Sequence, residues 1–403
     1  MNYDLIIVGG GAAGFFMAIN VAEKKPDYRI VILERGKEVL SKVRVSGGGR
    51  CNVTHAEFIP KELSKNYPRG EKEVLGPFHS FMTGDTIEWF GNRGVELKIE
   101  EDGRMFPVTD SSSTIINCFL KLAQDYNIEV LRNQVVKNFY YQDENWFVET
   151  NKTDFQSAKL AITTGSNVKI WNILSAIGHK IIAPVPSLFT FNIEDYRIKN
   201  LPGLSSNATV KVLNSQLQSE GPVLVTHWGL SGPAILKLSA WGAIILESFN
   251  YKFDISVNWL SGYNQQEVFE KLLELKEKKA KQLVVKYAQF ELPKRLWRSL
   301  VSAAHINEAK KWADVSNKEW HALSEQLTHC IFKVDGKSTF KEEFVTAGGV
   351  DLKEINFKTY ESKVCPNLFL AGEVINVDAI TGGFNFQNAW TGAFIAAQKI
   401  TDE

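Results

Sequence analysis

Four residues near the N-terminus have the types and spacing needed to hold a dinucleotide. Gly9, Gly11 and Gly14 form a G-x-G-x-x-G pattern, which directly follows an apolar run. The first glycine permits a tight turn, the second lets a pyrophosphate approach the backbone, and the third lets a helix pack closely. Glu34 lies 20 residues after Gly14, where its carboxylate can accept hydrogen bonds from a ribose. A plain βαβ unit ending in a solvated glutamate is the alternative, but the complete order of parts favours a nucleotide site.

The elements that must position these residues can be predicted from the same stretch. Leu5–Val8 and Arg29–Glu34 are apolar and β-branched, which is typical of buried parallel strands. Between them a helix is expected from Ala12 to about Glu23. Its first N–H groups and the positive end of its dipole then point toward bound phosphates.

A second glycine run, from Ser46 to Asn52, contains three consecutive glycines followed by Arg50. Successive backbone N–H groups and a guanidinium can together bind an anionic or carbonyl-rich ligand. A flexible loop explains the bare pattern equally well.

The run Ser46–Thr54, SGGGRCNVT, resembles the signature of the BaiN/YhiN-like NAD(P)/FAD-dependent oxidoreductases, also described as aminoacetone-oxidase-like flavoproteins. Further stretches similar to this family are Gly103–Pro107, Thr226–Pro233, Val345–Asp351, Glu361–Lys363, Ala371–Glu373 and Thr381–Gln387. The resemblance spans nearly the whole chain and implies non-covalent FAD. It also implies an α/β fold, in which a discontinuous Rossmann-like FAD-binding domain carries an inserted β-rich and helical domain. The chain departs from the family at Thr163–Trp171, where the loop is shorter.

The resemblance also implies roles for particular residues. Glu373, at the end of a last strand from Asn367, would bind the ribityl hydroxyls. The main chain at Val136 would meet the adenine, and Thr164 and Gly165 would close the pocket. A closing helix over Asn388–Ile400 would stabilise negative charge at the flavin pyrimidine edge. The predicted cofactor-binding residues are Gly9, Gly11, Ala13, Gly14, Glu34, Arg35, Lys42, Ser46, Gly47, Gly48, Arg50, Cys51, Asn52, Val136, Thr164, Gly165, Gly372, Glu373, Gly382, Gly383, Phe384 and Asn385.

His227 is the predicted catalytic acid or base, because it lies in the Gly/Ser/Pro-rich stretch Thr226–Pro233. The alternative is that its ring only hydrogen-bonds the turn. Arg50 and Asn385 are the next candidates. The remaining histidines, His55, His79, His179, His305, His321 and His329, are less favoured.

Composition narrows the class of protein further. The 403 residues include 46 basic and 46 acidic side chains, so the net charge argues against a nucleic-acid partner, a tRNA-modifying enzyme included. The four cysteines form no close pair, which predicts a cytoplasmic setting with neither a metal site nor a redox dithiol. Cys51 is therefore not expected to exchange electrons with the flavin. No apolar run is long enough for a membrane span.

The length and the pattern of elements predict three segments. Residues 1–187 and 340–403 form the FAD-binding domain, and residues 188–339 form an inserted substrate or lid domain. The predicted helices cover residues 110–127, 265–279, 293–303 and 317–328. The predicted strands cover residues 128–131, 135–141, 146–150, 159–163, 189–193, 208–213 and 251–257.

The function predicted from these observations is hydride transfer by an FAD-dependent oxidoreductase. A small organic substrate or dioxygen would be reduced, with NAD(P)H as a candidate donor. The absence of a second G-x-G-x-x-G means that a nicotinamide would bind without its own Rossmann unit. The alternative is a sensory flavoprotein whose insertion binds a partner. The sequence singles out neither a substrate nor an oligomeric state.

Overall fold

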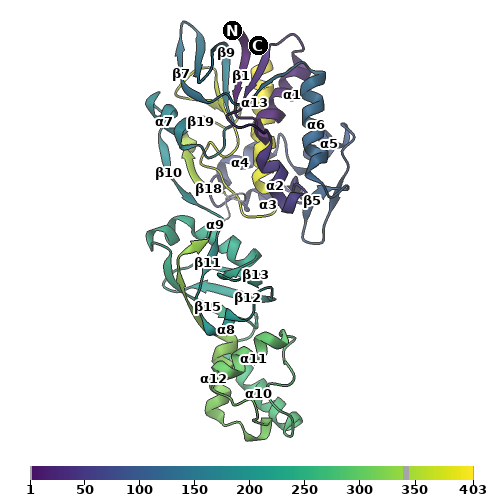
Figure 1. Cartoon of the computed structure of the whole chain (residues 1–403), viewed down its shortest axis with the longest axis vertical. Coiled ribbons are helices and arrows are strands. Elements are labelled where there is room, and N and C mark those ends of the chain that lie inside the picture. The colour runs from purple at the N-terminus through teal and green to yellow at the C-terminus, as the bar shows by residue number, and fades with distance from the viewer. Residues whose placement is uncertain (1, 339–344, 403) are drawn as a thin grey trace. The chain divides into compact units, whose positions relative to one another are not determined.

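The computed structural model describes residues 2–338 and 345–402 and divides into two compact units (Figure 1). The first unit joins Met1–Pro186 to Lys341–Glu403, and the second is Ser187–Phe340. Each unit has its own hydrophobic core.

A largely parallel sheet forms the centre of the first unit. Its order is β19-β20-β21-β9-β1-β2-β6, and β7 and β8 extend it beside β9. The strands are β1 (Asn2–Val8), β2 (Ile30–Leu33), β6 (Glu129–Leu131), β7 (Val136–Gln142), β8 (Asn145–Thr150), β9 (Asp154–Ile162), β19 (Ile355–Asn356), β20 (Glu361–Ser362) and β21 (Leu368–Leu370). Parallel pairing joins β21 to β9, β9 to β1, β1 to β2 and β2 to β6. The expected Rossmann-like α/β class is confirmed.

Smaller elements surround this sheet. One small sheet consists of β3 (Thr54–His55), β5 (Arg104–Pro107) and β4 (Leu97–Ile99), and another pairs β10 (Ile181–Pro186) with β18 (Thr346–Val350). The helices are α1 (Ala12–Lys24), α2 (Ser41–Gly49), α3 (Pro60–Ser64), α4 (Glu71–Phe78), α5 (Thr83–Gly91), α6 (Ser112–Asp125), α7 (Val168–Ala176), the 3₁₀ turn η2 (Leu352–Glu354) and α13 (Phe384–Thr401).

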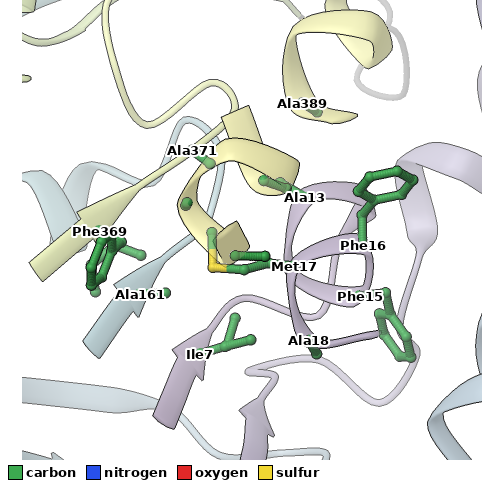
Figure 2. Packing of buried hydrophobic residues seen from close by; sticks show 14 of the residues in the cluster. Ile7, Ala13, Phe15, Phe16, Met17, Ala18, Ala161, Phe369, Ala371 and Ala389 are labelled. Atoms are coloured by element: carbon green, nitrogen blue, oxygen red, sulfur yellow. The ribbon is translucent and has the colours of Figure 1, made fainter. Parts of the chain in front are cut away.

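Helices α1 and α13 pack against each other and against the sheet. Small side chains such as Ala13, Ala18 and Ala389 are buried, which lets the helices approach closely. Phe16 of α1 contacts Trp390 of α13, with ring centroids 5.2 Å apart. Figure 2 shows Ile7 of β1 close to Met17 and Ala18 of α1, with Ala161 of β9 and Phe369 of β21 farther along the sheet and Phe15 and Phe16 on the other side of α1. The first and last helices of the chain therefore share one core.

The second unit is an antiparallel sheet followed by a helical region. The sheet order is β16-β15-β12-β13-β14-β11-β17. Its strands are β11 (Thr190–Asn192), β12 (Ser205–Val212), β13 (Gln218–Val225), β14 (Gly229–Ser231), β15 (Lys252–Asn258), β16 (Cys330–Asp335) and β17 (Lys337–Ser338). The helices are α8 (Tyr196–Lys199), α9 (Pro233–Ser248), α10 (Gln265–Lys279), α11 (Lys294–Ala303), the 3₁₀ turn η1 (Trp312–Asp314) and α12 (Asn317–Thr328). Trp297, Trp312 and Trp320 are buried, as core residues rather than as a stacking surface.

Several boundaries differ from those predicted. The closing helix begins at Phe384 rather than Asn388, because Gly383, with φ +96°, caps it earlier. Pro293 is the N-cap of α11 rather than a residue of its first turn. The helices α3, α4, α5, α7 and α9 were not expected. No helix within the described residues combines the length and apolar character that crossing a membrane requires.

Candidate functional site

The first glycine turn has the steric requirements that its pattern predicts. Gly9 has φ +116°, and a Cβ there would lie 2.6 Å from the carbonyl oxygen of Thr163, the residue that follows β9. A Cβ on Gly14 would lie 2.1 Å from the Gly9 oxygen. In contrast, a Cβ on Gly11 would meet nothing within 4 Å. Gly9 and Gly14 are therefore required by the protein's own packing, whereas Gly11 leaves open space at the start of α1.

Glu34 lies at the end of β2, and its two carboxylate oxygens are held by the backbone. The N–H groups of Gly10 and Gly36 donate to it at 2.9 Å and 2.7 Å. The backbone N–H of Gln134 donates to the Glu34 carbonyl at 2.9 Å, so the chain leading to Val136 runs beside the acid. This arrangement brings the predicted ribose acid and the predicted adenine segment together, while the Arg35 side chain is exposed.

The second glycine run forms a tight backbone loop rather than a flexible one. Gly47, Gly48 and Gly49 all have left-handed φ values, +58°, +69° and +86°, which interrupt α2. A Cβ on Gly47 would lie 2.6 Å from the Phe106 ring, whereas a Cβ on Gly48 would meet nothing within 4 Å. The N–H of Cys51 donates to the Ser46 carbonyl at 3.0 Å and closes the loop.

This loop contacts the start of α13, more than 300 residues away in sequence. The Asn52 side-chain oxygen accepts from the N–H of Gly383 at 3.0 Å. In the same orientation of the amide, its nitrogen donates to the Thr54 carbonyl at 3.0 Å. Trp390 donates to the Val53 carbonyl at 2.9 Å, and Thr54 donates to Gln387 at 2.6 Å. The two predicted cofactor segments are thus one connected structure.

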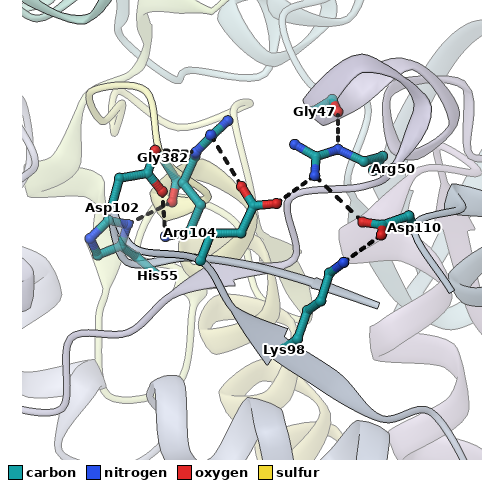
Figure 3. Close-up of polar contacts among 9 residues, drawn as sticks. Gly47, Arg50, His55, Lys98, Asp102, Arg104, Asp110 and Gly382 are labelled. Carbon is teal, nitrogen blue, oxygen red and sulfur yellow. Dashed lines mark hydrogen bonds and ion pairs between the residues drawn. The ribbon is translucent and has the colours of Figure 1, made fainter. Parts of the chain in front are cut away.

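Side chains around Gly382 fix the turn that precedes α13. Nδ1 of His55 lies 3.0 Å from the Gly382 carbonyl oxygen (Figure 3). The His55 ring also stacks on Phe384, with ring centroids 4.4 Å apart. Tyr67 donates to the Phe384 carbonyl at 2.6 Å. The Asn385 side-chain oxygen accepts from the Ala379 N–H at 3.0 Å, and its side-chain nitrogen donates to the Ala379 carbonyl at 3.1 Å. Asn385 is therefore engaged in closing the loop.

Glu373 lies close to two of the residues predicted to share its site. The ammonium of Lys42 forms an ion pair with its carboxylate, and a Cβ on Gly165 would lie 3.4 Å from one of its oxygens. The preceding Gly372 has φ +78°, and a Cβ there would be 3.5 Å from Cβ of Ala13. Thr164 adjoins the same turn, half-buried. The starts of α1, α2 and the loop after β21 therefore meet.

Arg50 is held by carboxylates on neighbouring loops. Its guanidinium contacts Glu100 at 2.5 Å and Asp110 at 3.4 Å, and lies 3.9 Å from the centre of the Phe106 ring. It also donates to the Gly47 carbonyl at 3.4 Å (Figure 3). Glu100 and Asp110 raise the pKa of this guanidinium by stabilising its charge. These contacts make Arg50 a support for the glycine loop.

A buried ion pair that the sequence did not reveal anchors the loop before α13. Arg69 donates to the carboxylate of Asp378 at 2.6 Å, and Asp378 is fully buried. His55 and Gln387 also support this region without having been predicted. The only sequence signal was their position inside or beside the segments 46–54 and 381–387.

His227 lies in the second unit, in the turn between β13 and β14. The turn is closed by Thr226, whose N–H donates to the Gly229 carbonyl at 2.8 Å and whose hydroxyl accepts from the Trp228 N–H. His227 is exposed, and among the described residues its ring has no hydrogen bond. The ring therefore makes no hydrogen bond to the turn in this structure, and its catalytic role stays a prediction.

The residues of the first unit fit FAD. A Cβ on Gly11 or Gly48 would meet nothing within 4 Å, and neither α1 nor α13 has an acidic residue in its first turn. Such helix starts suit an anionic pyrophosphate and a flavin edge. In the described part of the chain, no three His, Cys, Asp or Glu side chains gather to hold a metal ion.

Replacing Gly11 by valine should remove FAD without unfolding the protein. The added side chain meets no protein atom at Cβ but occupies the space beside the α1 N-terminus. We expect flavin absorbance per protein to fall at least tenfold, with an unchanged circular dichroism spectrum. Gly84→Val, at an exposed and equally open position, is the control. Gly14→Val should instead unfold the turn. Full FAD occupancy in Gly11→Val would contradict the assignment.

Cys51→Ser should keep FAD and most of the turnover. Burial raises the pKa of the Cys51 thiol to about 12, so the thiol is protonated at neutral pH. Because the thiol's pKa is higher in the folded protein than its ordinary value of 9.0, the folded state holds this proton more tightly than the unfolded state does. The resulting stabilisation is complete below pH 9.0 and is lost as pH rises through about 12. Between these two pH values, the free energy of unfolding measured with urea should therefore fall less steeply with pH in Cys51→Ser than in wild type. The two slopes should differ by up to about 1.4 kcal/mol per pH unit. Cys118→Ser is the control for turnover only, because burial also raises the pKa of the Cys118 thiol, to about 11. Loss of turnover in Cys51→Ser with FAD retained would restore a thiol mechanism.

Comparisons with known proteins agree with this geometry. The family model described as "HI0933-like protein Rossmann domain" matches residues 3–399. The Haemophilus influenzae protein named ribosomal RNA dihydrouridine synthase is 27% identical, covering 98% of both chains. The Clostridium scindens protein named 3-dehydro-bile acid delta(4,6)-reductase is 23% identical, also covering 98% of both.

Among solved structures, a Rhodococcus jostii 3-ketosteroid-delta4-(5alpha)-dehydrogenase matches with a TM-score of 0.53 at 11% identity. The match covers 100% of this chain and 97% of that one, and it shows a common fold. Since the family model covers almost all of the sequence and the family resemblance found in the motifs is confirmed, the chain belongs to the HI0933-like family of FAD-binding, Rossmann-fold oxidoreductases and is an enzyme.

Proposed function

We propose that this enzyme uses NAD(P)H to reduce a carbon–carbon double bond conjugated to a carbonyl, and that its substrate is a uracil base of ribosomal RNA. The observation that carries the proposal is the full-length similarity to a protein named ribosomal RNA dihydrouridine synthase. The relative named as a bile acid delta(4,6)-reductase supports the same reaction class, because a dienone and a uracil both present an alkene conjugated to a carbonyl.

This substrate differs from the one that composition suggested. A net charge of zero argued against nucleic acid, but net charge is a sum over the chain and hides an uneven distribution. A small enone is the second candidate, favoured by the bile acid relative, although that protein is the less similar of the two.

The residues of the first unit have two tasks in this proposal. The glycine turns at Gly11 and Gly48 and the start of α13 hold the pyrophosphate and the flavin edge, and Glu34 and Glu373 bind ribose and ribityl hydroxyls. FAD, when bound, supplies the two-electron step that moves hydride from nicotinamide to substrate. The protein must also deliver a proton to the carbon next to the carbonyl, and we assign that proton to His227.

The proposal is tested with ribosomal RNA purified from cells that lack the gene. Incubation with the FAD-loaded enzyme and NADH or NADPH should produce dihydrouridine, measured by mass spectrometry of digested nucleosides, with matching oxidation of the nicotinamide. A conjugated bile acid dienone is assayed in parallel. Reduction of the dienone with no dihydrouridine in the RNA would select the second candidate, and reduction of neither would reject the proposed reaction class.

His227→Asn should slow dihydrouridine formation at least roughly a hundredfold, because a placed proton donor typically contributes about 10² to 10⁴ in rate. FAD content and flavin reduction by the nicotinamide should remain normal, and the pH–rate profile should lose one limb. His305→Asn changes another exposed histidine of the same unit, whose left-handed φ of +60° suits asparagine, and should be silent. Equal turnover in both variants would exclude His227 as the acid.

A further inference from the structure

One region of the second unit concentrates positive charge in an otherwise neutral chain. Residues 276–311 contain ten Lys or Arg and three Asp or Glu, while the whole chain has 46 of each. The region covers the end of α10, all of α11 and the segments that join them to η1 (Figure 1). We call it the basic region.

Backbone contacts bring the parts of the basic region together. Leu283 and Lys311 form an antiparallel bridge, and the N–H of Val284 donates to the Lys310 carbonyl at 3.1 Å. Trp297 of α11 donates to the Val284 carbonyl at 2.8 Å. The three stretches of sequence that carry the cations therefore lie close together in the second unit.

Most of these cations have no anionic partner within the described residues. Six side chains of the region are exposed and take part in no ion pair or hydrogen bond among the described residues: Lys278, Lys281, Lys286, Lys294, Arg298 and Lys311. In contrast, Lys310 is paired with Glu319 at 2.7 Å. The acids Glu277, Glu291 and Glu308 are exposed within the region and reduce its charge without neutralising it.

Helix electrostatics explain only some of these positions. Lys276, Lys278 and Lys279 lie in the last turn of α10, where the helix dipole favours cations. Lys294 and Arg295 instead begin α11, where the dipole disfavours them, and no acidic residue accompanies them. Arg295 donates to the Asn200 carbonyl at 2.7 Å, but Lys294 and Arg298 have no such contact. Lys294, in the first turn of α11, therefore costs stability that an external anion would offset.

An aromatic side chain adds a second feature suited to nucleic acid. Tyr287 is 51% exposed, and the ammonium of Lys286 lies 5.4 Å from its ring centre. Exposed aromatic rings beside cations provide stacking surfaces for unpaired bases, while the cations contact phosphates.

We propose that the basic region docks the phosphate backbone of structured RNA, with Tyr287 stacking on an unpaired base. This inference rests on the proposed function and adds the surface through which the enzyme selects RNA. The affinity for RNA then depends on Lys281, Lys294 and Arg298, whereas FAD binding and flavin reduction do not depend on these residues.

The test compares Lys281→Gln/Lys294→Gln/Arg298→Gln with the control Lys72→Gln/Lys152→Gln/Lys358→Gln, which removes three exposed lysines of the first unit. Binding to the purified ribosomal RNA is measured over a salt series, together with dihydrouridine formation. The first variant should bind at least roughly tenfold more weakly, and the slope of log affinity against log salt should fall by about 3. The control should match wild type, and both variants should keep normal NADPH-dependent flavin reduction.

Other outcomes separate the two proposals. If wild type forms dihydrouridine and the first variant matches it in RNA affinity and rate, the basic region is not the docking surface. If wild type forms no dihydrouridine but binds RNA through these residues, the proposed reaction fails and the docking surface stands. The RNA assignment would be overturned if wild type did not bind RNA. It would also be overturned if the variant lost binding to phosphatidylglycerol vesicles but kept its binding to RNA.

Discussion

The packing of α1 against α13 is the constraint on which the FAD-binding unit depends. These two helices come from opposite ends of the chain, yet they share one core through contacts such as Phe16 with Trp390. Because Gly372 fits between Ala13 and Ala389, the two helix starts are held near the loop that carries Glu373. An insertion of more than 150 residues can separate the halves in sequence without changing this geometry, since both helices are anchored to the same parallel sheet.

The loops depend on the same packing. The segment after Ser46 has three left-handed glycines in succession, a conformation with a high entropic cost unless neighbours fix it. Asn52, Thr54 and Arg50 supply these neighbours, through α13 and through the loops that carry Glu100 and Asp110. A glycine run that would be flexible in isolation is thus held by its neighbours, while a Cβ on Gly48 would still meet nothing within 4 Å.

Features encoded locally could be predicted from the sequence. The helices Gln265–Lys279 and Asn317–Thr328 have the predicted bounds, because Asn264 with Glu267 and Ser316 with Glu319 form capping boxes readable within a few residues. The pair Arg69 and Asp378 could not be predicted, since its members are 309 residues apart and no local pattern joins them. The start of α13 was misjudged for a similar reason. The helix was predicted from Asn388, but Asn52 and His55, distant in sequence, bond Gly383 and Gly382 and fix the turn from which it begins at Phe384.

The charges in the first unit fit an anionic cofactor because its carboxylates are already engaged. Glu34 accepts two backbone N–H groups, Glu373 pairs with Lys42, and Asp378 pairs with Arg69. Breaking a buried pair such as Arg69 and Asp378 is typically costly, about 3 to 5 kcal/mol, so this loop has a strong preference for one arrangement. No acid lies in the first turn of α1 or α13, so no side chain there opposes the positive ends of these helix dipoles. In the site that we propose, the helix start that attracts a pyrophosphate and the one that stabilises negative charge on a reduced flavin would act by the same electrostatic effect, so cofactor affinity and redox function would have one physical origin.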